Sequence, residues 1–159
     1  MGMKLAVFGS RTITDDRVEA EISEFLQQNA GYDTIVTSQE PKGVCAVAQQ
    51  YAKHNGIVLE LHFLDFDKYA RGAWCHRSEH IISAADYVLL IHDGVSKGTA
   101  NELEQTRKRN KPHKCIVLEK TTELERSKGT DILTKDIPKS HELFVPDLFG
   151  AELVGADMV

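Results

Sequence analysis

The chain has 159 residues, of which 42% are hydrophobic and 27% are charged, with a formal net charge of −5. This length fits one globular domain, and the acidic balance argues against binding to nucleic acid, because such surfaces need an excess of basic residues. No apolar run approaches the roughly 18 residues of a membrane helix and no signal-like N-terminus is present, so we expect a cytoplasmic protein without membrane contact. Three widely spaced cysteines, without a CxxC pair, argue against a disulfide framework and a thiolate zinc cluster.

Short apolar runs that lead into segments with helical spacing recur along the first 118 residues. Strands are predicted over residues 4–8, 34–37, 57–63, 86–91 and 115–118, with helices between 16 and 31, 44 and 56, 74 and 85, and 98 and 110. Asp16 and Glu19 have the spacing of a capping box at the start of the first helix. One face of the third helix is expected to lie against the core, and it carries Trp74, Ser78, Ile81, Ile82 and Ala85.

Strands that alternate with helices are typical of a parallel sheet covered by helices on both faces. The sequence therefore predicts an α/β fold, a Rossmann-like three-layer sandwich with a five-stranded, mainly parallel sheet, over residues 1–119. Residues 120–159 form a C-terminal extension, which could pack on the same domain. Within it, "HELFV" at 141–145 indicates an edge strand.

Loops that follow the strands should meet at the carboxyl edge of the sheet, where open parallel sheets bind ligands. A Gly-Thr pair that opens a helix offers backbone N–H groups and the positive end of the helix dipole to a phosphate, although helix capping alone also explains such residues. "SKGT" occurs at 96–99 and at 127–130, and only the first follows a strong apolar strand. The candidate ligand-binding residues are Gly9, Ser10, Arg11, Ser38, Lys42, Gly43, Lys97, Gly98 and Thr99.

Four segments, "VFGSRTITD", "KGVCAVAQQYAKHNGI", "FDKYARGAWCHRSEHIISAADYVLLI" and "GTANELEQTRKRNKP", resemble the YspA-like branch of the SLOG superfamily. The resemblance covers about residues 4–118 and implies a Rossmann-like domain that binds nucleotides or nucleotide-derived ligands. LOG-type phosphoribohydrolases of this superfamily use a helical arginine and a glutamate in Gly-Thr-x-x-Glu, and nucleoside deoxyribosyltransferases have a glutamate on a comparable helix. The resemblance thus implies Arg77 and Glu102 as catalytic candidates.

The chain departs from the SLOG pattern after the second strand. In place of Gly-Gly-Ala-x-Gly-x-Asp it has Gln39-Glu40-Pro41-Lys42-Gly43-Val44-Cys45, and the usual Arg-Asn pair is Arg77-Ser78. Side chains at 39 and 40 should obstruct the close approach that glycine allows, and a carboxylate at Glu40 should repel phosphate. The glutamate at 102 also has a simple structural explanation, because the helix dipole favours an acid in the first turn.

His76, Glu79 and His80 form an H-x-x-E-H motif, the inverted zincin signature, whose two histidines are spaced to bind zinc. They are expected on the helix face opposite Trp74, where a solvated surface is the simpler interpretation. We therefore predict neither a metal nor a resident cofactor.

Three functions are compatible with these patterns. The first is a SLOG-type sensor that binds a nucleotide-like small molecule at the carboxyl edge of the sheet. The second is a nucleotide N-glycosidase, a phosphoribohydrolase or a deoxyribosyltransferase that uses Glu102 and Arg77. The third is an interaction module with a degenerate pocket. A homo-oligomer is compatible with each of them.

Overall fold

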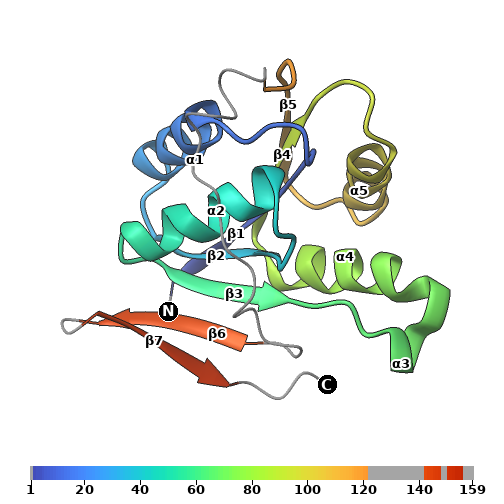
Figure 1. Ribbon diagram of the computed structural model, residues 1–159. Coiled ribbons are helices and arrows are strands. Elements are labelled where there is room, and N and C mark those ends of the chain that lie inside the picture. Colours follow the sequence, from blue (N-terminus) through green and yellow to red (C-terminus); the bar gives the residue numbers. More distant parts are fainter. Residues whose placement is uncertain (1, 122–141, 148–149, 156–159) are drawn as a thin grey trace.

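The computed structural model describes residues 2–121, 142–147 and 150–155, the last two ranges as backbone (Figure 1). Five parallel strands run in the order β5-β4-β1-β2-β3, which confirms the predicted α/β sandwich with a mainly parallel sheet. Their bounds are β1 Met3–Gly9, β2 Tyr32–Ser38, β3 Val58–His62, β4 Tyr87–His92 and β5 His113–Val117.

Two further strands lengthen the sheet beyond the five predicted. β6 (Glu142–Asp147) pairs antiparallel with β3, which confirms that "HELFV" forms a strand. β7 (Gly150–Gly155) pairs antiparallel with the other side of β6, so β6 is internal to the sheet and the edge position expected for it is wrong. The five parallel strands match the prediction, and of the two added strands only β7 was not expected from the sequence. β7 has glycine at both ends and only six residues, so its sequence carries little strand signal without its partner.

Helices cover both faces of the sheet because successive strand residues point to opposite sides. α1 (Asp16–Gln28) and α2 (Gly43–His54) pack on the face that includes Leu5 and Val7. α4 (Ala73–Ala84) packs on the opposite face, which includes Ala6 and Phe8, and Leu103 of α5 (Lys97–Lys108) lies against the same cluster. This arrangement places the N-termini of α1, α2, α4 and α5 at the carboxyl edge of the parallel strands.

Three details of the helices differ from the sequence predictions. The N-cap of α1 is Asp15, whose side chain accepts a hydrogen bond from the Arg17 backbone, so the capping box at Asp16 is wrong. A short α3 (Phe66–Tyr69) and a 3-10 turn, η1 (Ala70–Gly72), precede α4 and are too short to give a periodic signal. Trp74 is 47% exposed, so the expectation that its side chain packs against the core is also wrong.

Among the described residues, no helix combines the length and the apolar composition needed to cross a bilayer.

Candidate functional site

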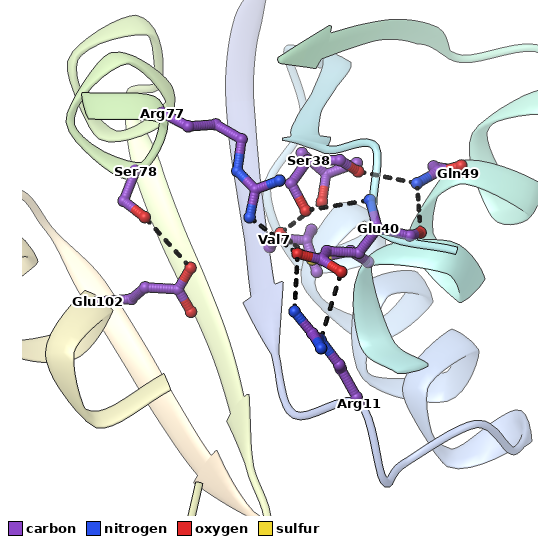
Figure 2. Close-up of polar contacts among 10 residues, drawn as sticks. Val7, Arg11, Ser38, Glu40, Gln49, Arg77, Ser78 and Glu102 are labelled. Carbon is purple, nitrogen blue, oxygen red and sulfur yellow. Dashed lines mark hydrogen bonds and ion pairs between the residues drawn. The ribbon is translucent and has the colours of Figure 1, made fainter. Parts of the chain in front are cut away.

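The carboxyl edge of the sheet brings together Arg77, Arg11 and Glu40 from three separate segments (Figure 2). Arg77, on α4, is only 5% exposed, and its Nη2 donates a hydrogen bond to Oε1 of Glu40 at 2.9 Å. The other terminal nitrogen, Nη1, is buried and has no hydrogen-bond partner among the described residues. A buried guanidinium group with one unpartnered nitrogen is unusual, because desolvated donors are nearly always paired.

Arg11 approaches the same carboxylate from the loop after β1. Its Nε lies 3.3 Å from Oε2 of Glu40, and its Nη2 donates to Oε1, also at 3.3 Å. The Arg11 side chain is 65% exposed, so this second ion pair is open to water. Glu40 therefore bridges the two arginines. The sequence led us to expect that its carboxylate would repel phosphate, but in the structure it is the counter-ion of both arginines.

Gln49, on α2, fixes the loop that carries Glu40. Its Nε2 donates to the backbone carbonyls of Ser38 at 2.8 Å and Glu40 at 3.1 Å. The Ser38 hydroxyl also accepts a 3.5 Å hydrogen bond from the Glu40 backbone N–H. The buried Gln49 amide thus holds the loop after β2, the segment in which the chain lacks the glycines of the SLOG pattern. No local sequence signal identifies Gln49, because its role depends on the distance between α2 and the end of β2.

Glu102 lies on α5 beside Ser78 of α4, whose hydroxyl donates a hydrogen bond to Oε2 at 3.4 Å. Burial raises the pKa of Glu102 to about 8, and the positive charge of Arg77 and the Ser78 hydrogen bond only partly oppose this shift. The nearby negative charge of Glu40 raises the pKa of Glu102 further, whereas Arg11 lowers it. Glu102 is therefore mostly protonated at neutral pH and can donate a hydrogen bond or a proton.

The loop from β4 to α5 is organised by Asp93. Its carboxylate accepts hydrogen bonds from the backbone N–H groups of Val95 at 2.9 Å and Ser96 at 2.7 Å, and from the hydroxyls of Thr12 at 2.7 Å and Ser96 at 2.8 Å. Although burial acts to raise the pKa of Asp93, these hydrogen bonds hold it well below its usual range. Two of the N–H groups in the predicted phosphate loop are thus already bound by the protein's own carboxylate.

Ser10 joins this loop to the one after β1. Its Oγ accepts a hydrogen bond from the Asp93 backbone N–H at 3.0 Å and lies 3.3 Å from the hydroxyl of Thr99. Both hydroxyl side chains are buried at about 2% exposure. Ser10 and Thr99 were predicted as ligand contacts, and in this structure they contact each other.

The remaining predicted residues divide into packing glycines and exposed rim residues. A Cβ at Gly9 would collide with the side chain of Val44, and one at Gly43 would collide with the backbone of Arg11. Gly43 also has a φ of +77°, so it permits the close contact between α2 and the loop after β1. Lys42, Lys97 and Gly98 are exposed at the rim.

The H-x-x-E-H residues do not form a metal site in the described part of the chain, where no group of three or more potential metal ligands gathers. The ring of His76 stacks on Tyr69 at 3.9 Å between centroids, and the rings of His76 and His80 are 6.4 Å apart. Glu79 faces α5, with Oε1 3.5 Å from Arg109. These side chains contact α3 and the residue that follows α5, while His76 and Glu79 stay 44% and 34% exposed, as expected for a solvated surface.

Comparison of the chain with protein-family models, with curated proteins and with solved structures gives no match. The function therefore has to be inferred from the site itself. Of the residues that sequence reasoning did not select, only Asp93 had a recognisable signal, since Asp followed by Gly-Val-Ser is typical of a turn that caps its own backbone.

Proposed function

We propose that the protein binds a nucleotide or nucleotide-derived ligand at the carboxyl edge of its sheet, with the anionic group of the ligand against Arg77 and Arg11. The observation that carries the proposal is the buried Nη1 of Arg77, which has no hydrogen-bond partner in the part of the chain that the structure describes. A phosphate oxygen or another ligand acceptor would supply the missing hydrogen bond, and guanidinium groups suit phosphate because they can donate two parallel hydrogen bonds.

The charge of the site favours a ligand of low negative charge. Arg77 and Arg11 carry two positive charges, Glu40 carries one negative charge and protonated Glu102 carries none, which leaves a net charge of one positive unit. A phosphodiester or a nucleoside monophosphate suits this balance better than a triphosphate does. The ligand must either share the arginines with Glu40 or displace it.

A thermal-shift and calorimetric screen of nucleoside monophosphates, cyclic nucleotides and nucleotide sugars tests the proposal. A ligand at about 100 times its Kd should stabilise the native state by about 2.7 kcal/mol. Arg77→Gln should abolish this shift, and Arg11→Gln should weaken it. Arg71→Gln, which changes an exposed arginine on η1, is the matched control and should leave the shift unchanged.

Each variant is compared with its own ligand-free state, so a loss of basal stability in Arg77→Gln does not obscure the result. The proposal fails if no member of the panel stabilises the wild-type protein. It also fails if a stabilising ligand acts equally on wild type and on both site variants.

The raised pKa of Glu102 favours hydrolysis of an N-glycosidic bond as a second candidate function. A protonated carboxyl is suited to general acid catalysis, in which the C1′–N bond breaks, the base leaves with the Glu102 proton, and water adds to C1′ and returns a proton to Glu102. Release of free base, detected by chromatography, should be lost in Glu102→Gln and should decline above pH 8. Absence of free base with a nucleotide that is shown to bind eliminates this candidate.

A further inference from the structure

Two exposed aromatic side chains lie at the N-terminal ends of α3 and of α4, the helix that carries Arg77. Trp74, at the start of α4, is 47% exposed and Phe66, at the start of α3, is 50% exposed. Their ring centroids are 5.0 Å apart and their planes meet at 70°, an edge-to-face contact. Large apolar side chains that are exposed together, rather than singly, often mark binding surfaces.

The position of Trp74 on α4 follows from helical spacing. Trp74 is three residues before Arg77 and four before Ser78, so its side chain lies within about 60° of each of them around the helix axis, between the two. Arg77 and Ser78 are buried and contact Glu40 and Glu102. Trp74 is therefore on the site-facing side of α4, one turn nearer its N-terminus.

The same spacing explains why Trp74 is exposed. Ile81 and Ile82 pack over Phe8 and Val36 of the strands, whereas Arg77 already reaches Glu40, two residues after β2 ends. Trp74 is one further turn out, or about 4.5 Å along the axis. The side of α4 that covers the sheet thus continues past the strand ends, where no strand covers the indole.

Phe66 is held in place by the helix on which it lies. The Asp65 side chain caps α3 by accepting a hydrogen bond from the Lys68 backbone at 3.0 Å, and Tyr69 stacks on His76 of α4. The first contact holds the turn of α3 together, and the second fixes α3 against α4. The Phe66–Trp74 pair is therefore a preorganised surface, which lowers the entropic cost of binding a ring against it.

We propose that Trp74 and Phe66 stack against the nucleobase of the ligand whose anionic group binds Arg77 and Arg11. This inference rests on the proposed function and specifies that the ligand carries a planar aromatic ring on the α3–α4 side of its phosphate. Stacking tolerates any base because every base has a π face, so these two residues provide affinity while polar neighbours provide selectivity.

Trp74 is the only tryptophan in the chain, so its fluorescence reports on this surface directly. The probes are AMP, GMP, CMP, UMP and ribose 5-phosphate, which has the sugar and phosphate but no base. Emission is excited at the red edge of tryptophan absorption, where the nucleotides do not absorb, and calorimetry measures affinity independently. At least one nucleotide should quench Trp74 and bind at least about tenfold more tightly than ribose 5-phosphate.

Variants separate stacking from phosphate binding. Trp74→Ala and Phe66→Ala should each weaken nucleotide binding, Trp74→Ala by about tenfold, while the affinity for ribose 5-phosphate is unchanged. Trp74→Phe should retain part of the nucleotide affinity. Met3→Ala, which changes an exposed apolar residue at the opposite end of β1, is the control and should bind normally.

Equal affinities for nucleotides and ribose 5-phosphate, dependent on Arg77 but not on Trp74, would overturn the stacking proposal and leave the proposed function intact. If none of the probes binds and the wider nucleotide panel also fails, both proposals are wrong. If Trp74→Ala instead converts a dimer to a monomer in sedimentation, the aromatic pair is a contact between copies of this chain, and the stacking proposal is overturned.

Discussion

Two loops at the carboxyl edge each place a carboxylate of the protein where an anionic ligand could bind. The loop after β4 carries Asp93 and the loop after β2 carries Glu40, and the two carboxylates are bound differently. Asp93 accepts four hydrogen bonds of 2.7–2.9 Å from Thr12, Val95 and Ser96. Glu40 has one contact of 2.9 Å to Arg77 and two of 3.3 Å to the exposed Arg11, and Nη1 of Arg77 has no hydrogen-bond partner within residues 2–121.

This difference shows which loop is structural and which can exchange partners. An anion that displaces Asp93 must break four short hydrogen bonds within a partly buried turn. An anion that reaches Arg77 can use a free donor and compete with Glu40 at a partly hydrated ion pair. The arginines, rather than the backbone N–H groups near Ser96, are therefore the better anion site.

The largest expected effect is the pH dependence of stability that Glu102 causes. Burial raises the pKa of Glu102, and the negative charge of Glu40 adds to this rise. The folded protein keeps this proton up to about pH 8, whereas the unfolded chain releases it near the ordinary value of 4.5. The free energy of unfolding attributable to Glu102 is therefore highest below pH 4.5 and falls by several kcal/mol as pH rises to 8.

Urea denaturation at a series of pH values checks this. Glu102→Gln should remove that fall, and Glu40→Gln should make it shallower by removing a like charge. Parallel pH profiles for wild type and Glu102→Gln would mean that Glu102 is ionised in the native state.

Asp93→Ala should lower the free energy of unfolding by about 3 kcal/mol, because it leaves two backbone N–H groups and two hydroxyls without their acceptor. Inorganic phosphate should not restore this loss. The matched control is Asp67→Ala, at an exposed aspartate of α3, where urea denaturation should show a change within about 0.5 kcal/mol. A full rescue of Asp93→Ala by phosphate would show that this loop also exchanges its anion.

Glu40→Gln should cost about 1–2 kcal/mol, less than the loss of a fully buried ion-pair partner, because Arg11 is exposed. Here phosphate should restore stability, and it should stabilise the variant more than the wild type in a thermal-shift titration. Glu104→Gln breaks an exposed pair with Lys108 and serves as the control. If phosphate has the same effect on both variants, the proposal that an anion can replace Glu40 but not Asp93 is wrong.

The smallest effect is expected for Ser10→Ala, which removes the link between the two loops. Loss of the hydroxyl leaves the Asp93 N–H and the Thr99 hydroxyl without a buried partner, at a cost of about 1 kcal/mol. Ser83→Ala, at an exposed serine of α4, should be neutral in the same urea denaturation. Equal stability of the two variants would show that the loops are independent of Ser10.

The amino-acid sequence by itself determined the α/β layering. Runs such as Leu5 to Phe8 are apolar at every position, which requires a strand buried on both faces, and the helical stripe at Ile81 and Ile82 requires a sheet to cover it. Local patterns of this kind act over a few residues and can be found without the fold. They also placed the loop of Arg11 at the carboxyl edge, because parallel strands end at the same side, whereas Arg77 and Glu102 were selected through the family resemblance.

Only the tertiary structure decided how those residues are paired. Glu40 and Arg77 are 37 positions apart in sequence, and Gln49 meets the Glu40 loop only because α2 packs across the end of β2. The exposure of Trp74 likewise depends on where the strands end relative to α4. The helical spacing of residues in α4 cannot predict that position. Charge pairing and burial are set by distances between separate elements, and such distances exist only once the sheet and its helices have packed together.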